Sequence, residues 1–151
     1  VWGQTCRDDI PASAPDGRFT DNGDYTATDL ATGLTWKQCA EGLSGTGCAT
    51  GAPATFTWQA ALQHAEAAVF AGRADWRPPN KNELASLVEP RCYDPAINLR
   101  WFPSTPSTWF WSSSPYAGYP GSAWSVDFYG GYVDGNFRGD ADHVRLVRGG
   151  Q

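Results

Sequence analysis

The sequence predicts an α+β domain in which antiparallel strands at both ends of the chain flank two helices. Residues 17–38 alternate in a two-residue pattern that turn residues interrupt, which is typical of a small strand meander. Residues 58–70 and a shorter stretch after Asn80 instead repeat apolar side chains at helical spacing, and strand patterning returns after residue 107. This order of strands, helices and strands favours the α+β class.

The length and charge of the chain limit the classes of function. At 151 residues it suits a single domain, 1–151, with a core of its own. No apolar run approaches the roughly 18 residues of a membrane span. The formal net charge is -5 without a basic stripe, so the long-range field would repel a polyphosphate backbone. We therefore expect no nucleic-acid partner and no direct membrane insertion.

The four cysteines are expected to form disulfides. Cys6, Cys39, Cys48 and Cys92 lack the paired short spacings of a zinc site. Three connectivities are open, but the short glycine-rich segment between Cys39 and Cys48 favours a local bridge, which leaves Cys6 with Cys92. Disulfides imply an exported protein, in the periplasm, in the medium or at the cell surface. Because the chain has no methionine and no leader, we expect a processed or excised piece of a longer protein.

Turn residues divide the first half of the chain. Asp21-Asn22-Gly23-Asp24 predicts a hairpin turn, and Thr32-Gly33 predicts a second one. A calcium loop at the first turn is disfavoured because the other oxygen ligands of an EF-hand pattern are absent. Residues 42–53 are glycine-rich and are predicted to form a loop pinned by the local disulfide.

Two helices are predicted from caps and apolar spacing. Thr57 is expected to cap a helix from Trp58 to about Phe70, with Gly72 as its stop. The apolar stripe of this helix is interpreted as core and comprises Trp58, Leu62, Ala65 and Val69. Asn80 and Glu83 have the spacing of a capping box, and they open a short helix that ends before Pro90. Its inward side chains are Leu84, Leu87 and Val88. We therefore interpret Glu83 as a cap rather than a catalytic acid. His64 is interpreted as a surface or cap-satisfied residue rather than a ligand.

Residues 101–151 combine aromatic, glycine and serine residues, with few side chains suited to catalysis. Tyr and Trp supply rigid contact area while Ser, Gly and Asn supply adaptable hydrogen bonds, which is typical of recognition surfaces. A β-rich core with tight turns would have the same composition, so position has to decide. Strands are predicted at 109–113, 123–129, 132–138 and 143–148.

Gly130-Gly131 predicts a two-residue type I′ hairpin turn, because glycine adopts positive φ without strain. This turn would place Tyr129 opposite Tyr132 and Asp127 opposite Asp134. Alternate residues share a face, and one face is predicted to be core: Trp124, Val126, Phe128, Val133, Gly135 and Phe137. Glycine on this face leaves room for a neighbour. The other face is polar and aromatic: Ser125, Asp127, Tyr129, Tyr132, Asp134, Asn136 and Arg138.

This second face is the candidate ligand-binding surface. A solvated strand face would have the same pattern, but an exposed tyrosine pair and two opposed aspartates favour binding, since opposed like charges cost stability. Neutralisation by Arg138 is the structural alternative. Tyr116 and Tyr119, in the loop 115–121, would extend the surface.

The connection after the hairpin contains Asp140, Asp142 and His143. These three residues are too few to indicate a metal site by themselves, and a solvent-exposed turn is favoured. We expect no metal and no other cofactor.

Five segments together resemble the bacterial Lcl-type C-terminal domain family, named for the end domain of a collagen-like adhesin: 29–36, 76–84, 110–116, 123–128 and 144–151. The resemblance implies a C-type-lectin-like fold, a cell-surface location and a binding role, in some members toward host glycans such as sulfated glycosaminoglycans. Some relatives are varied by diversity-generating retroelements. By that analogy the variable ligand contacts would be Ser125, Tyr129, Asp134, Asn136, Arg138 and His143.

The chain departs from the family pattern in several places. Pro78 stands where members often have leucine, and Leu146 stands where they often have cysteine, so the family's disulfide scheme need not apply. The acidic charge argues against sulfated ligands, which favour Arg and Lys. Glu-Pro-Asn and Trp-Asn-Asp, the sugar-binding motifs of calcium-dependent lectins, are absent from the sequence.

We therefore expect a non-enzymatic, adhesin-like recognition domain that binds a protein or glycan on another cell or surface. The alternative is a distal or trimerising domain of a surface fibre or pilus subunit, in which protomers bury the aromatic surface of a homo-oligomer. A third reading is a relative of formylglycine-generating oxidases, which need reactive cysteines or a copper site, whereas all four cysteines are expected in disulfides.

Overall fold

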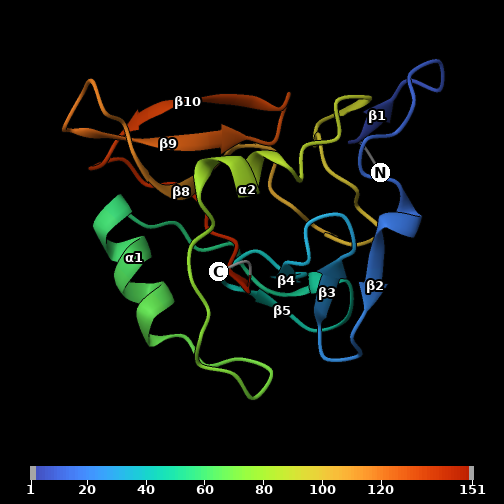
Figure 1. Ribbon diagram of the computed structural model, residues 1–151, viewed down its shortest axis with the longest axis horizontal. Helices are drawn as coiled ribbons and strands as arrows, with labels where there is room; N and C mark the ends of the chain where they lie inside the picture. Colours follow the sequence, from blue (N-terminus) through green and yellow to red (C-terminus); the bar gives the residue numbers. More distant parts are fainter. Residues whose placement is uncertain (1–2, 150–151) are drawn as a thin grey trace.

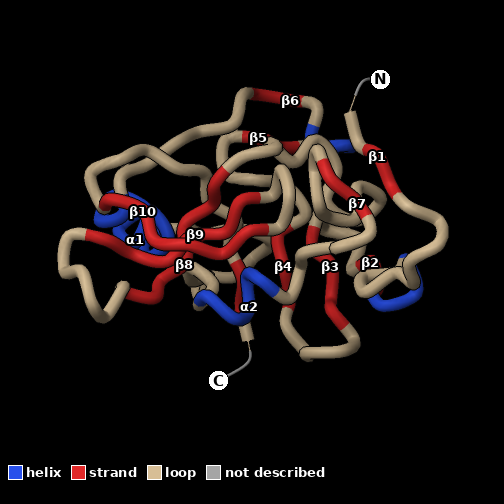
Figure 2. Tube along the Cα trace, turned by 90° about the horizontal axis from the view of Figure 1, so that it is seen from above, coloured by secondary structure: helices blue, strands red, loops and turns tan. Residues whose placement is uncertain are grey.

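The computed structural model describes residues 3–149 and has an α+β fold with two helices and several short antiparallel sheets (Figure 1). Two of the sheets lie side by side along the long axis of the molecule (Figures 1 and 2). Gly150 and Gln151, at the end of the segment 144–151, lie outside the described residues.

The first sheet has the order β11-β4-β3-β2. Its strands are β2 (Phe19–Asp21), β3 (Thr26–Asp29), β4 (Thr35–Lys37) and β11 (Val147–Arg148). The second sheet has the order β10-β9-β8. Its strands are β8 (Trp109–Pro115), β9 (Ser122–Asp127) and β10 (Tyr132–Phe137). Two small pairs complete the fold: β1 (Thr5–Cys6) with β7 (Cys92–Tyr93), and β5 (Leu43–Ser44) with β6 (Thr50–Gly51).

The predicted meander is confirmed, because β2, β3 and β4 pair in sequence across the two expected turns. Asp29 at the end of β3 is fully buried, and its carboxylate receives two hydrogen bonds from Arg18, at 2.8 and 2.6 Å. Burial would raise the pKa of Asp29, but hydrogen bonds from Arg18 and Ala31 lower it overall. This ion pair joins the start of the meander to its second turn.

Helix α1 (Trp58–Ala67) begins where expected but ends before Phe70. The Thr57 hydroxyl accepts a hydrogen bond from the Ala60 amide and so caps the first turn. Ala68 is extended, and Phe70 pairs with Arg73 in a tight turn that continued helix would prevent. Val69, expected in the core, is therefore 74% exposed.

Helix α2 (Lys81–Ala85) has the predicted capping box. The Asn80 side chain accepts from the Glu83 amide, and the Glu83 carboxylate accepts from the Asn80 amide, both at 2.8 Å. Glu83 also forms a bidentate pair with Arg77, which lowers the pKa of the carboxyl. Glu83 is thus a cap, and α2 lies against β8 and β9 (Figure 1). Leu84 on α2 and Leu87 in the turn after it are buried in the core.

Two disulfides join Cys6 to Cys92 and Cys39 to Cys48, the pairing expected from the sequence. The first ties the N-terminal segment to β7, and the second closes the β5–β6 loop. Disulfides are typical of proteins that fold in an oxidising, extracellular environment. Neither helix among the described residues has the length and hydrophobicity of a membrane-spanning segment.

The core consists of two apolar clusters, one centred on Trp36 and the phenylalanines 102, 110 and 128, the other on Trp76 and Trp111. Arg145 is fully buried next to the first cluster, and its sequence neighbours Val144 and Leu146 belong to the second. Its guanidinium donates to the carbonyls of Lys37 and Gln38 and to the Thr105 hydroxyl, at 3.2, 2.6 and 2.8 Å. It lies over the rings of Phe102 and Phe110. Burial lowers the pKa of Arg145 to about 9, so the group is still charged at neutral pH.

Replacing Asp29 with Asn should lower stability and flatten its dependence on pH. The folded-state pKa of Asp29 lies below the unfolded value, so the pair with Arg18 stabilises above the unfolded pKa and is lost as pH falls through the folded one. Urea unfolding at neutral pH should show a loss of about 3 kcal/mol for Asp29→Asn. The two proteins should converge at pH values below the folded pKa; a constant gap between them would contradict the assignment.

Arg145→Met should lower the free energy of unfolding by about 2 to 4 kcal/mol, because the acceptors that Arg145 bonds stay buried and lose their donor. Methionine fills a similar volume, but the backbone carbonyl of Gln38 and the Thr105 hydroxyl would lose their donors. Arg73→Met, at an exposed position, is the matched control. Equal stability of the two variants in urea would show that the hydrogen bonds of Arg145 do not stabilise the fold.

Candidate functional site

The β9–β10 hairpin carries the predicted binding surface, but its register differs from the expected one. Asp127 pairs with Tyr132 and Ser125 with Asp134, so Asp127 and Asp134 are not opposed. The turn contains four residues, 128–131, because Phe128 is drawn into the core. Its amide donates to the Thr108 carbonyl and its carbonyl accepts from Ala96, at 3.0 and 2.6 Å. These bonds prevent strand pairing at Phe128 and override the glycine turn signal.

The shift of two residues keeps every side chain on its predicted face, but burial differs from the prediction at three positions. Ser125 was expected on the presented face and is fully buried, since β9 is the central strand and its Cα partners are Trp111 and Asp134. Phe137 and Val133 were expected in the core and are 69% and 39% exposed. Helix α2 packs on β8 and β9, and the far end of the edge strand β10 projects beyond it.

Tyr116 stacks on the half-buried Trp124, with ring centroids 4.3 Å apart and an angle of 24° between the planes. The Lys81 ammonium lies over the same indole, 4.3 Å from its centroid. The Tyr116 ring also lies directly against Gly135, where any Cβ would collide with it. The expected space beside Gly135 is therefore confirmed, and Tyr116 occupies it.

Exposed apolar side chains lie on the edge strand, in the two turns that flank it and on β7, and we call them the aromatic strip: Tyr93, Tyr119, Tyr129, Tyr132, Val133 and Phe137. Along β10 they lie on both faces, since Tyr132 points to one side and Val133 and Phe137 to the other. Tyr132 is 66% exposed, Tyr119 65% and Tyr129 47%. Tyr129 lies 6.2 Å from Tyr93 on β7, between ring centroids. The exposure expected for Tyr119, Tyr129 and Tyr132 is confirmed, while Tyr116 is half-buried against Trp124 and lies 5.4 Å from Tyr119 between ring centroids.

The outer edge of β10 is capped by its own side chains. The Gly135 amide donates to the Asp134 carboxylate, at 2.7 Å, and the Phe137 amide donates to the Asn136 side-chain oxygen, at 3.0 Å. Amides on an unpaired edge otherwise invite another strand. β10 thus presents side chains rather than open backbone groups at these two positions.

The remaining predicted contacts are partly engaged within the protein. Arg138 lies 4.3 Å over the Trp58 ring, and its Nε donates to the Ser122 carbonyl. The Asn136 amide group donates to the buried Asp142 carboxylate at 2.9 Å. Arg138 therefore belongs to the contact with α1 and does not neutralise Asp127 and Asp134 through an ion pair.

His143 lies beside β8 and bridges it through two backbone hydrogen bonds, to Trp109 and Trp111. Its ring packs 5.5 Å from that of Phe110, and its Nδ1 is buried without a partner among the described residues. Burial lowers the pKa of His143, and a hydrogen bond to the Ala54 backbone, which would raise the pKa, only partly offsets this effect. The predicted outward contact is thus a half-buried, uncharged residue next to the core.

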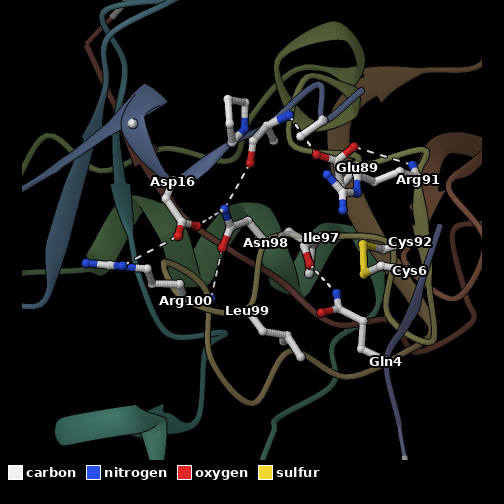
Figure 3. A pocket seen from close by; sticks show the side chains of 14 residues that line it. Gln4, Cys6, Asp16, Glu89, Arg91, Cys92, Ile97, Asn98, Leu99 and Arg100 are labelled. Atoms are coloured by element: carbon white, nitrogen blue, oxygen red, sulfur yellow. Dashed lines mark hydrogen bonds and ion pairs between the residues drawn. A yellow bond between two sulfur atoms is a disulfide. The ribbon is translucent and has the colours of Figure 1, made fainter. Parts of the chain in front are cut away.

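A separate cavity of about 640 Å³ lies between the N-terminal segment and residues 89–100 (Figure 3). Its polar groups bind one another. The buried Glu89 carboxylate accepts from the amides of Ser13 and Ala14, and Asn98 donates to the Ala14 carbonyl and to Asp16. These bonds hold the N-terminal segment in place, so we assign the candidate site to the aromatic strip. Residues 3–149 contain no group of three or more His, Cys, Asp or Glu side chains that could hold a metal ion.

Sequence reasoning missed Tyr93, Phe137 and the Lys81–Trp124 contact. Tyr93 is distant in sequence and reaches the strip only through β7. The Phe137 exposure follows from β10 being an edge strand, which a lone hairpin pattern does not reveal.

The fold and the surface define a disulfide-bonded α+β domain that presents aromatic side chains on an edge strand. Residues 25–148 match the model of the Lcl C-terminal domain family, and the chain belongs to this family. The resemblance that the five segments indicated is thereby confirmed. The search of curated proteins gives no match.

Gly135→Ala should displace Tyr116 from Trp124 while the domain stays folded, because the added methyl group occupies the position of the Tyr116 ring. We expect a loss of about 1 to 3 kcal/mol in unfolding free energy and a change in the near-ultraviolet circular dichroism of the stacked rings. Gly139→Ala is the control, since its Cβ would meet nothing within 4 Å. Identical spectra for both variants would show that the stack does not depend on Gly135.

Proposed function

We propose that this chain is an adhesin-like recognition domain that binds a ligand through the aromatic strip and the adjoining polar side chains of β9 and β10. The single observation that supports this most is the exposure of five aromatic rings on and beside the edge strand β10. Exposed rings contribute little burial energy to folding. Exposed apolar patches commonly mark interaction sites. Tyrosine also gives contact area at a small cost in side-chain entropy.

The framework around the strip supports the same role. Tyr116 stacks on Trp124, packs against Gly135 and contacts Tyr119, so it supports one end of the strip. The side chains of Asp134 and Asn136 occupy two outward amides of β10. The exposed positions Tyr129 and Tyr132 can therefore vary without loss of the core. This property suits a ligand surface that a diversity-generating retroelement varies, and it fits the C-type-lectin-like fold that we propose for the domain.

Family membership and the two disulfides support a place in a surface-associated protein. The ligand is then a protein or glycan on another cell or surface, and the role is non-enzymatic. All four cysteines are paired, so none is left as the thiol that a formylglycine-generating type of oxidase would use.

A second candidate is assembly into a fibre, in which another copy of the chain covers the aromatic strip. The unpaired position of β10 at the sheet edge favours it, but the capped amides of Gly135 and Phe137 disfavour strand-to-strand joining. Light scattering over a range of concentrations separates the two, because assembly requires a persistent oligomer that hides the tyrosines.

Tyr129→Ala combined with Tyr132→Ala should abolish or weaken binding, by about 100-fold, to a ligand found on a glycan and surface-protein array. Both rings are exposed, so the free energy of unfolding of the double variant should lie within about 1 kcal/mol of the parent value. Tyr25→Ala is the matched control, since Tyr25 is 48% exposed and lies outside the strip. Unchanged affinity in the double variant would rule out this surface as the binding site.

A further inference from the structure

The acidic side chains around the aromatic strip are not in ion pairs. Asp127, Asp134 and Asp140 lie on β9, on β10 and in the turn after β10, and within residues 3–149 none of them pairs with a basic group. Five other aspartates each pair with an arginine: Asp8, Asp9, Asp16, Asp29 and Asp75. Lys81, at the start of α2, and Arg138, directly after β10, instead lie over the rings of Trp124 and Trp58.

Two of these carboxylates adjoin the exposed tyrosines. Asp127 is the Cα partner of Tyr132, and its Oδ1 accepts from the Tyr129 amide at 2.9 Å. Asp134 follows Tyr132 by two residues and lies on the same side of the strand. A cation that approaches this surface therefore reaches a carboxylate and a ring face together, and both attract it.

The caps on the β10 edge restrict how a partner can bind. A peptide that added as another strand would need the outward amides of Gly135 and Phe137 to be free, or at least to be released first from Asp134 and Asn136. Contacts through side chains require no such release. The edge thus favours a partner that brings charged side chains to the strip.

We infer that the aromatic strip docks a cationic segment of a partner protein, whose lysine or arginine side chains sit between the tyrosines and the carboxylates of Asp127 and Asp134. This inference rests on the proposed recognition function and specifies its partner class by charge complementarity. The exposed carboxylates would repel a sulfated glycan from the same surface.

The test uses isosteric variants that keep the backbone contacts. In the first, Asp127, Asp134 and Asp140 are all changed to Asn, whose side-chain oxygen still accepts from the amides of Tyr129 and Gly135. In the control, Asp8→Asn, Asp21→Asn and Glu66→Gln alter the net charge equally at exposed positions off β9 and β10. Both variants and the parent are titrated with an end-blocked peptide of alternating arginine, lysine and serine, and binding is followed by amide chemical shifts.

The parent should show shifts centred on Tyr129, Tyr132 and Asp134, with affinity that falls as salt is added. The first variant should bind the peptide roughly ten-fold more weakly, as expected for the loss of several exposed charge contacts, and the control by less than about two-fold. Shifts located elsewhere, no binding by the parent, or equal weakening in both variants would overturn the inference.

Failure of this inference differs from failure of the proposed function. An array ligand, such as a heparin oligosaccharide, that needs Tyr129 and Tyr132 but is unaffected by the three aspartate changes would overturn the cationic partner and leave the recognition role intact. Absence of any tyrosine-dependent ligand on the array would overturn the recognition role itself.

Discussion

The buried guanidinium of Arg145 is the contact on which the rest of the structure depends. It joins the end of β4, through the carbonyls of Lys37 and Gln38, to the loop that contains Thr105. Its stacking on Phe102 and Phe110 links the same point to β8. A side chain with a fixed fork of donors suits this position, because three acceptors from two segments have to be satisfied inside the core. The two sheets therefore meet around one charged group rather than around apolar contacts alone.

The binding surface is attached to this framework through a small number of specific contacts. Phe128 anchors the β9–β10 turn in the core, and Tyr116 fills the space that Gly135 leaves beside Trp124. Outside these anchors, the edge strand contributes little to the core, so its outward side chains are free to serve a ligand. Aromatic rings remain exposed there although the core does not need them, which separates the requirements of folding from those of recognition.

The sequence predicted what depends on local chemistry. The meander turns, the Thr57 cap, the Asn80–Glu83 capping box and the loop closed by Cys39–Cys48 all arise from neighbouring residues, and the structure contains them. The errors arise from contacts distant in sequence. The Gly130-Gly131 signal was overridden because Phe128 bonds to Thr108 and Ala96, and the burial of Ser125 and exposure of Phe137 follow from the order β10-β9-β8. Strand order within a sheet is set by the whole fold, and one hairpin pattern does not encode it.

The claim that the exposed rings serve binding rather than folding has a direct test in the stability of a single variant. Tyr119, Tyr129, Tyr132 and Phe137 are replaced together by serine, and the free energy of unfolding in urea is measured. Since these side chains are largely exposed, the variant should remain folded and lie within about 2 kcal/mol of the parent. A loss of more than about 4 kcal/mol, or a variant that fails to fold, would show that the rings hold the domain together and would contradict a surface kept for a ligand.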